Sequence, residues 1–334
     1  MELIDLTLIW IVILGFGVLM YVLMDGFDLG VGILFPFAPS NAARDDMMNS
    51  VAPVWDGNET WLILGGAGLL AAFPMVYAVF LPALYIGVFL LLAGLIFRGV
   101  AFEFRFKANR SRYIWDHAFN IGSTVAAFAQ GAVVGAYIQG FQVEGFQYVG
   151  GPFDWLTPFT VMTGLGVVTG YALLGATWTI LKTEGETQRW AWRITPWLIV
   201  GMLAFFLLVS VWTPLTNERV FERWFGNIEV LWIFPVATLA VCAWLYQAVR
   251  KRREGTPFVA TMTLFVLFYI GLLISMWPYA VPPEHTFWDA ASDPGSQLFL
   301  LLGFLFVIPF VLGYTAWTYW VFRGKVGNQQ GYGH

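Results

Sequence analysis

Long apolar runs, separated by short polar segments, follow one another along the whole chain. Each run has about 20 residues or more, the length at which a helix crosses a hydrocarbon core of about 30 Å. The pattern predicts an all-α polytopic membrane protein. We expect nine transmembrane helices, over residues 6–35, 52–73, 75–104, 117–140, 157–181, 195–214, 228–250, 258–278 and 297–322.

The composition agrees with a membrane protein. Hydrophobic residues make up 59% of the chain and charged residues 11%, against about 25% charged residues in an average soluble domain. No polar segment is long enough for a soluble domain, so residues 1–334 are expected to form a single integral membrane domain. The sequence has no basic patch of the kind that would indicate a nucleic-acid partner. The one cysteine, Cys242, lies in an apolar run, and no Cys/His cluster predicts a metal site.

Prolines add detail to the predicted helices. Pro196 is expected near the start of its helix, where a missing N–H group costs little. Pro82, Pro235 and Pro309 fall inside their helices and are expected to kink them.

The distribution of lysine and arginine predicts the orientation. Fourteen of the 17 basic residues follow the first, third, fifth, seventh and ninth helices, whereas the opposite loops hold only Arg219 and Arg223. Basic loops stay in the cytoplasm. We therefore expect the N-terminus outside and the C-terminus in the cytoplasm, which requires an odd number of spans.

A faint internal repeat relates the first and fifth helices. The repeat matches Asp5, Val12, Gly15 and Gly17 to Asp154, Val161, Gly164 and Gly166. Both helices start outside, so the repeat favours two four-helix units of the same direction with the ninth helix appended. Parallel repeats of this kind also occur in transporters.

Acidic side chains interrupt the apolar runs on one side of the membrane. Asp25 and Asp28 lie toward the cytoplasmic end of the first helix, and Asp56, Asn58 and Glu59 lie in the first turns of the second. The acids of each helix are three residues apart and therefore share a helix face. Ionisable groups inside a membrane usually face the protein interior and mark ion or proton routes.

The third helix brings Arg98 and Glu103 to a similar depth. We therefore expect one cluster of carboxylates and an arginine on three consecutive helices. Such a cluster suits proton transfer. A purely structural role is the alternative: Arg98 neutralises one or two acids and locks the helices together, and Asp56 or Glu59 interacts with the helix dipole. No histidine falls in the middle of a predicted span, where a pair of axial haem ligands would be expected.

Four segments carry a family resemblance. MDGFDLGVGIL, NSVAPVWDGNETWL, AAFPMVYA and FRGVAFEFR, all within residues 20–117, resemble motifs of subunit II of the cytochrome bd family of quinol oxidases. The compact length resembles the branch often called cyanide-insensitive oxidases. The resemblance implies two four-helix bundles, within residues 1–140 and 141–278, and a peripheral ninth helix at 297–322.

The resemblance also implies function and partners. Such a complex, in the bacterial cytoplasmic (inner) membrane, oxidises quinol and reduces oxygen to water with protons taken from the cytoplasm. Haem b and haem d, or a b haem in its place, belong to a haem-bearing subunit I, so this chain is expected to ligate no cofactor. Further implied partners are small single-helix accessory subunits, membrane lipid and a bound quinone.

Roles transfer to individual positions through the motifs. Asp56, in the WDGN motif with Asn58, matches the acid at the cytoplasmic mouth of the proton route. Asp25 and Asp28 match the acids of the first helix. Arg98 matches the basic residue of the same region.

Two positions depart from the family pattern. Many relatives carry Asp at the position of Glu103, and relatives can have an uncharged residue at the position of Glu59. The departure puts a role for Glu59 in doubt.

Two other functions are compatible with paired intramembrane acids. A proton-coupled secondary transporter would be active alone and would contain unwound helices at mid-membrane. A purely structural partner of another membrane subunit is the third interpretation. The acids lie near one side of the membrane here, which favours the oxidase subunit over the transporter.

Overall fold

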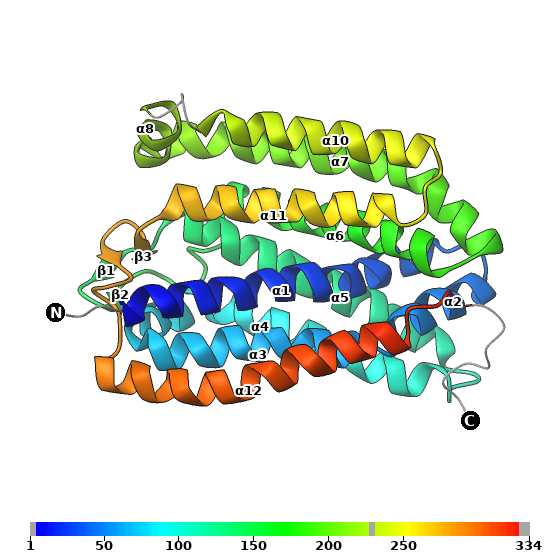
Figure 1. The fold of residues 1–334 in the computed structure, drawn as a ribbon, viewed down its shortest axis with the longest axis horizontal. Coiled ribbons are helices and arrows are strands. Elements are labelled where there is room, and N and C mark those ends of the chain that lie inside the picture. The colour runs from blue at the N-terminus through cyan, green and yellow to red at the C-terminus, as the bar shows by residue number, and fades with distance from the viewer. Residues whose placement is uncertain (1–4, 227–230, 327–334) are drawn as a thin grey trace.

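The long helices run side by side along the longest axis of the molecule (Figure 1). The computed structural model describes residues 5–226 and 231–326, which are almost entirely helical. Within these residues, nine helices have at least 18 residues. They are α1 (Leu6–Leu34), α3 (Trp55–Ala72), α4 (Pro74–Arg105), α5 (Arg112–Gln139), α6 (Pro158–Lys182), α7 (Gly185–Thr216), α10 (Ile233–Arg250), α11 (Thr256–Met276) and α12 (Pro294–Val321).

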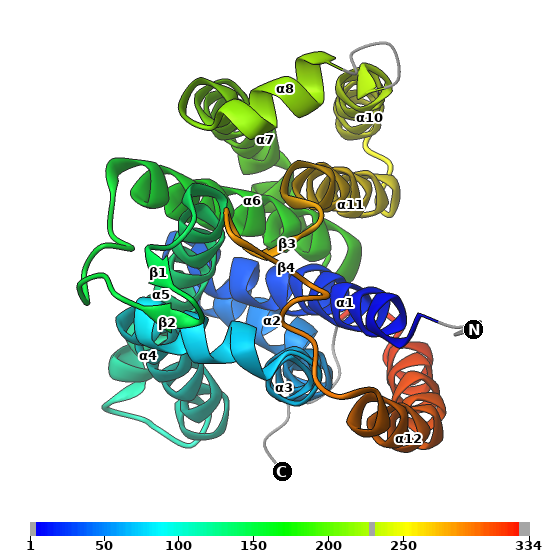
Figure 2. The same ribbon diagram turned by 90° about the vertical axis from the view of Figure 1, so that its left-hand side faces the viewer.

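Short elements lie at the two ends of these helices. One end, the α2 end, carries a 3₁₀ turn (Phe35–Phe37) and α2 (Asn41–Val51). The other, the α8 end, carries α8 (Glu218–Gly226) and two antiparallel hairpins (Figures 1 and 2). The hairpins pair β1 (Val143–Glu144) with β2 (Gln147–Tyr148), and β3 (Tyr279–Val281) with β4 (His285–Thr286).

Eight of the long helices are long and apolar enough to cross a membrane. The exception is α3, whose 18 residues include Asp56, Asn58 and Glu59. These polar residues occupy its first turns, and the rest of the helix is apolar. α3 nevertheless lies alongside its neighbours (Figure 1), so its environment is set by α1, α4 and α12.

α1 lies at the centre of the molecule and packs against α3, α5 and α6. Every residue from Leu23 to Phe35 is buried. The closest approach is to α6: a Cβ atom on Gly30 would lie 1.8 Å from the carbonyl oxygen of Tyr171, and one on Gly175 would lie 2.3 Å from the carbonyl carbon of Gly30. Only glycine allows two helix backbones this close. Small residues have this packing role in membrane helices.

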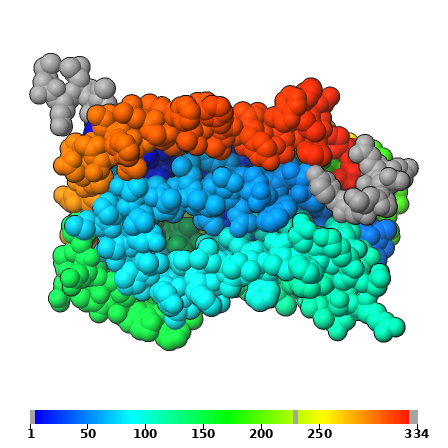
Figure 3. All heavy atoms as spheres, turned by 90° about the horizontal axis from the view of Figure 1, so that it is seen from below, coloured from blue at the N-terminus to red at the C-terminus, as the bar shows by residue number. Residues whose placement is uncertain are grey.

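α12 lies on the surface beside α3 (Figure 3). Most of its side chains are exposed in the isolated chain, and no residue in its most apolar 18-residue window is buried. Its C-terminal end is held by Lys182 of α6, which donates hydrogen bonds to the carbonyl oxygens of Phe322 and Gly324. These carbonyls end a helix, where a cation is favourable.

Several predicted boundaries were wrong because helices continue beyond the apolar runs. α5 begins at Arg112 rather than residue 117, and α7 at Gly185 rather than residue 195. Pro196 therefore lies inside α7, not near its start. Pro82 and Pro309 are interior, as predicted. Pro235 is instead in the first turn of α10, and the predicted start at residue 228 lies outside the described residues.

Candidate functional site

The candidate site is built around two aspartates of α1. Asp25 and Asp28 are fully buried and lie three residues apart, so both face the same neighbours. A buried carboxylate costs several kcal/mol unless it is paired or hydrogen-bonded. The surrounding helices supply the partners.

Arg98 of α4 pairs with Asp25. Its guanidinium is fully buried and donates one hydrogen bond to Asp25 Oδ1 at 2.5 Å and a second to Glu59 Oε2 at 2.7 Å. The Glu59 side chain is 26% exposed. One arginine therefore joins α1, α3 and α4, the three helices that the sequence predicted to share a cluster.

Asn58 of α3 holds Asp28. Its amide nitrogen donates to Asp28 Oδ2 at 2.7 Å and to the carbonyl oxygen of Met24 at 3.3 Å. Its amide oxygen accepts a hydrogen bond from the hydroxyl of Tyr319 at 2.8 Å. Tyr319 comes from α12, so the last long helix also contributes to the site. Sequence reasoning missed Tyr319 because nothing in an apolar run shows which distant helix it meets.

The cluster, which we define as Asp25, Asp28, Glu59, Arg98 and Asn58, contains three carboxyl groups and one guanidinium, and the guanidinium pairs with Asp25 and Glu59. The buried atoms Asp25 Oδ2 and Asp28 Oδ1 have no hydrogen-bond partner among the described residues. An unpartnered buried carboxylate oxygen is costly when the group is ionised. The arrangement therefore favours a cluster that carries fewer charges than its three acids would give.

A polar chain continues from the cluster into α5 and α6. Tyr21 lies one helical turn before Asp25 on α1, and its hydroxyl accepts a hydrogen bond from Gln130 Nε2 at 2.9 Å. The hydroxyl of Tyr171 donates to Gln130 Oε1 at 2.7 Å. The available sequence signal was Gln130 itself, an uncharged polar residue in an otherwise apolar helix.

Asp56 and Glu103 do not join the cluster, contrary to the prediction that all the acids gather. Asp56 is exposed and lines a small cavity of about 30 Å³ between α3 and α12, together with Asn58, Tyr314 and Tyr319. Asp56 and the cluster residue Asn58 thus line the same cavity. The side chain of Glu103 is 70% exposed, and its ion pair is with Lys107 at 3.3 Å. Glu103 lies on the exposed side of α4, whereas Phe102 and Arg105 lie on its buried side.

A second charged network, which the pattern of apolar runs does not reveal, lies at the α2 end. Arg105 of α4 is fully buried and donates to Asp116 Oδ1 at 2.5 Å and to Asp45 Oδ1 at 2.7 Å. Arg112 also pairs with Asp45, and the guanidinium of Arg105 lies 4.9 Å from the ring centre of Phe35. Arg105 was counted only as a loop cation, although its phenylalanine neighbours in FEFRF signal burial.

Asp46 lies next to this network on α2. Its carboxylate accepts a hydrogen bond from the hydroxyl of Thr187 at 2.8 Å. Burial raises the pKa of Asp46, and the hydrogen bond from Thr187 opposes this effect. α2 is thereby tied to the start of α7.

Metal-ligating side chains are not grouped in the described part of the chain. No set of three or more His, Cys, Asp or Glu residues there could hold a metal ion. His117 is exposed at the start of α5. His285 lies in β4, stacked on Phe146 with 4.0 Å between ring centres. Neither fits an axial haem ligand in a buried pocket.

The model of the family "Cytochrome bd terminal oxidase subunit II" matches residues 6–322. The chain belongs to this family. It is 31% identical to the cytochrome bd-I ubiquinol oxidase subunit 2 of Escherichia coli K12, over 97% of this chain and 96% of that one. It is 30% identical to the cytochrome bd ubiquinol oxidase subunit 2 of Bacillus subtilis, over 98% and 97%.

The fold agrees with this membership. The structure of the bd oxidase from Geobacillus thermodenitrificans contains a chain that matches with a TM-score of 0.80 at 16% identity, covering 98% of this chain and 100% of that one. This subunit II is therefore part of an oxidoreductase, a membrane-bound quinol oxidase in which it forms a complex with a subunit I.

Proposed function

We propose that this subunit II carries a proton-uptake route for oxygen reduction and stabilises the complex with the haem-bearing subunit I. Haem, bound in subunit I, would supply electron transfer and oxygen reduction. Quinol supplies the electrons, and a bound quinone, membrane lipid and small single-helix subunits complete the proposed complex. The residues proposed for the route are Asp25, Asp28, Asp56, Asn58, Glu59 and Arg98.

The observation that carries the proposal is the cavity between α3 and α12. Exposed Asp56 and buried Asn58 both line it. A volume of about 30 Å³ exceeds the roughly 10–15 Å³ that one water molecule needs. Asn58 connects this cavity to Asp28, which supports a stepwise route from Asp56 to the buried aspartates.

The charges of the cluster also support the proposal. With one guanidinium for three carboxyl groups, full ionisation leaves two negative charges in a largely buried site, which is costly. A proton held between Asp25 and Asp28 removes part of that cost. It would exchange with water in the cavity, and Asn58 would hold Asp28 in place without carrying the proton itself. Glu103 stays outside the proposed route, because it is exposed and paired with Lys107.

The same proposal includes nine spans, namely the eight helices that are apolar enough to cross a membrane and α3. Figure 2 shows α1, α3, α4 and α5 on one side and α6, α7, α10 and α11 on the other, which supports two four-helix units with α12 outside them. The basic residues gather at the α2 end, so that end is proposed to face the cytoplasm. The chain would then have its N-terminus outside and its C-terminus inside.

A proton-coupled transporter is not favoured. α1 is a continuous helix from Leu6 to Leu34, whereas a transporter site at mid-membrane is typically formed by interrupted helices. A purely structural subunit remains the outcome that the experiment must distinguish.

The test compares Asp56→Asn, Asp28→Asn and the double variant in the assembled oxidase. Asparagine keeps size and hydrogen bonding but cannot exchange a proton near neutral pH. Oxygen uptake with quinol, on complexes matched for haem content, is expected to slow by about tenfold or more. Reduction of the haems by quinol should change little, because electrons do not pass through α3.

Glu103→Gln is the matched control, since it also removes one acid at the α2 end but from an exposed surface position. It should keep the wild-type rate. If the double variant also keeps the wild-type rate across the pH range, the cluster is structural and the proton route is wrong.

A further inference from the structure

The hydroxyl of Tyr319 faces the amide oxygen of Asn58 and fixes the orientation of that amide. Asn58 is 1% exposed, and its nitrogen donates to Asp28 Oδ2 at 2.7 Å and to the carbonyl oxygen of Met24 at 3.3 Å. A carbonyl oxygen only accepts hydrogen bonds, so the contact with Met24 requires the nitrogen on that side. The amide oxygen then faces α12, where the hydroxyl of Tyr319 donates to it at 2.8 Å.

The hold on Asp28 depends on this hydroxyl. A buried amide oxygen without a donor is unfavourable, so an Asn58 that loses Tyr319 is no longer fixed in the orientation that presents its nitrogen to Asp28. Asp28 Oδ1 already has no hydrogen-bond partner among the described residues. Without the nitrogen of Asn58, the carboxyl group would therefore lose the contact that fixes its position beside the cavity.

Tyr319 can meet Asn58 only while α12 keeps its place beside α3. Few side chains hold α12 there, because its buried residues are Gln297 near one end and Thr318 near the other. Thr318 directly precedes Tyr319. The position of the hydroxyl is therefore set at the C-terminal end of α12.

Residues 322–326, which follow α12, attach this end to other helices. Lys182, the last residue of α6, donates hydrogen bonds to two carbonyl oxygens of this segment. Lys325 pairs with Glu254, between α10 and α11, at 2.7 Å. The end of α12 is thus held by groups on the opposite side of α12 from the acid cluster.

α6 also contacts the ring of Tyr319 directly. The ring of Trp178 meets it nearly edge-on, with 6.4 Å between the ring centres and an angle of 77° between the planes. Aromatic pairs favour this geometry. Trp178 therefore supports the ring of Tyr319, while its hydroxyl is directed to Asn58.

We infer that Tyr319 is a positioning residue of the proton route, and that α12 completes this route. The inference rests on the function proposed above. Tyr319 carries no proton in it: the hydroxyl keeps the nitrogen of Asn58 on Asp28, and the carboxyl group stays where water in the cavity between α3 and α12 can reach it.

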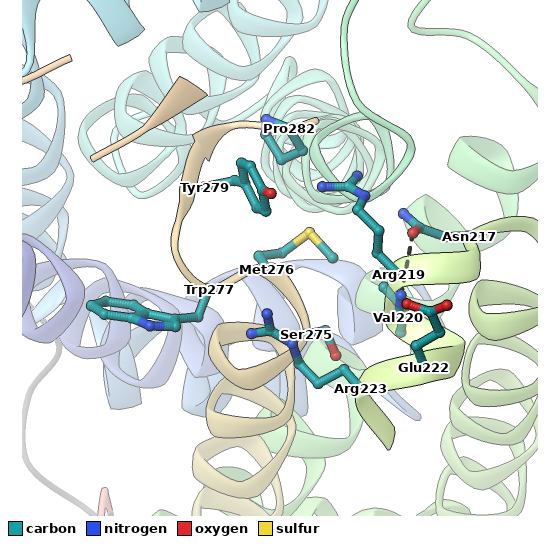
Figure 4. A pocket seen from close by; sticks show the side chains of 10 residues that line it. All are labelled: Asn217, Arg219, Val220, Glu222, Arg223, Ser275, Met276, Trp277, Tyr279 and Pro282. Carbon is teal, nitrogen blue, oxygen red and sulfur yellow. Dashed lines mark hydrogen bonds between the residues drawn. The ribbon is translucent and has the colours of Figure 1, made fainter. Parts of the chain in front are cut away.

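A larger cavity, of about 520 Å³, lies at the other end of the molecule. Its walls are α8, the end of α11 and the start of β3 (Figure 4). None of the residues that line it belongs to the cluster. Tyr319 instead lines the small cavity together with Asp56 and Asn58, so its substitution acts where the proposed route begins.

The test is Tyr319→Phe in the assembled oxidase, on complexes matched for haem content. Oxygen uptake with quinol should fall by about fivefold, the factor expected for the loss of one hydrogen bond. The loss should grow as pH rises, because slower uptake makes the supply of protons limiting. Reduction of the haems by quinol should not change. The substitution leaves in place the charged groups of the cluster and of the cavity wall, which are Asp25, Asp28, Asp56, Glu59 and Arg98.

A double-mutant cycle shows whether Tyr319 acts through Asn58. In an Asn58→Ala background, Tyr319→Phe should cause no further loss, because the amide that it positions is gone. A loss of the same factor in both backgrounds would overturn the inference. The pH profile of Tyr319→Phe alone decides the matter if Asn58→Ala does not assemble: a loss that is equal at every pH contradicts a role in proton supply.

Tyr269→Phe is the matched control. It removes the same group and also breaks one hydrogen bond between helices, since the hydroxyl of Tyr269 on α11 donates to the carbonyl oxygen of Gly15 on α1 at 2.8 Å. This contact is not part of the cluster or the cavity, so the variant should keep the wild-type rate and pH profile. The same pH-dependent loss in Tyr269→Phe would show that loosened helices explain the effect.

Asp28→Asn separates this inference from the proposed function. If Asp28→Asn keeps the wild-type rate, the proton route is wrong and the role of Tyr319 falls with it. If Asp28→Asn is slow but Tyr319→Phe keeps the wild-type rate at every pH, the route stands and the inference about Tyr319 alone is wrong.

Discussion

Arg98 is the side chain on which the buried cluster depends most, because it is the cation that two acids share. It keeps both hydrogen bonds only through the fork geometry of a guanidinium, which spans Asp25 and Glu59 from one position. A lysine at this site carries the charge but a single nitrogen. The two roles of Arg98, neutralising charge and joining three helices, are therefore separable by substitution.

We predict that Arg98→Leu lowers the yield of assembled oxidase far more than Arg98→Lys does. Leucine leaves Asp25 uncompensated in a buried site, and breaking a buried ion pair costs about 3–5 kcal/mol. Lysine retains the charge and should give an intermediate yield. The measurement is haem-containing complex per amount of membrane. Equal, normal yields from both variants would contradict the role of the ion pair.

Asp46 offers a pH-dependent prediction outside the membrane. Burial raises its pKa in the folded protein, so folding favours the protonated form. Its contribution to stability is complete below the pKa of the unfolded chain, about 3.9, and is lost as pH rises through the folded pKa. Asp46→Asn keeps an acceptor for the Thr187 hydroxyl. Because asparagine does not ionise, the variant should not lose this stability as pH rises.

The variant should therefore melt at a higher temperature than wild type near pH 7, and the difference should shrink toward pH 5. Thermal unfolding of the purified oxidase at the two pH values tests this. A difference that grows toward pH 5 would show that the sign is wrong. Glu103→Gln, which removes an exposed acid, serves as the control and should show little change.

The residues of the site were only partly predictable from the sequence. Asp25 and Arg98 could be found because a charge inside an apolar run needs a buried partner. The three-residue spacing predicted a shared face for Asp56 and Glu59, but only Glu59 reaches Arg98, while Asp56 is exposed and Asn58 is buried. Tyr319 and Gln130 were missed because an uncharged polar side chain in an apolar run is common, and its partner lies on a helix distant in sequence.

At the scale of elements, close contact between α1 and α6 positions the acids of α1. The two backbones meet at Gly30 and Gly175, where there is no room for a Cβ atom. A methyl group there must push the helices apart. Because Asp28 and Asp25 lie only two and five residues before Gly30 on the same helix, their contacts with Asn58 and Arg98 should loosen together.

We predict that Gly30→Ala and Gly175→Ala each reduce the melting temperature and yield of the oxidase. Overpacking a close-packed interior typically costs about 1–3 kcal/mol, and the contact with backbone atoms leaves little room for relief. Gly66→Ala is the matched control, because a Cβ atom there would meet nothing within 4 Å. Equal melting temperatures for all three variants would show that the α1–α6 crossing tolerates separation.

The helices were predictable where an apolar run equals a helix, and unpredictable where the helix continues into polar sequence. α7 begins with Gly185 in a polar stretch, and α2 and α8 are polar enough that hydropathy alone cannot reveal them. α3 differs in the opposite way, because its first turns carry Asp56, Asn58 and Glu59 and yet it packs among apolar helices. Asn58 and Glu59 bind Asp28 and Arg98 there. Hydropathy detects burial in lipid, not helix formation.

At the scale of the whole molecule, charge and site geometry lead to the same orientation. The cavity with Asp56 opens near the α2 end, and the network of Arg105, Arg112, Asp45 and Asp116 lies at that end as well. Fourteen of the 17 basic residues belong there. A route that takes protons from the cytoplasm must start on the cytoplasmic side, so the positive-inside rule and the proposed route depend on the same placement.

We predict that the α8 end is exposed to the periplasm and the α2 end to the cytoplasm. The chain contains one cysteine, Cys242, which is buried, so Cys242→Ser provides a background without thiols. In this background, Glu144→Cys lies in the β1–β2 hairpin at the α8 end, and Lys107→Cys lies at the α2 end after α4. Both native side chains are exposed on the surface.

A membrane-impermeant maleimide applied to intact cells whose outer membrane has been permeabilised should label Glu144→Cys and not Lys107→Cys. Lysis should expose both. Labelling of Lys107→Cys alone in intact cells would invert the orientation, and labelling of both would exclude a topology that separates these two ends.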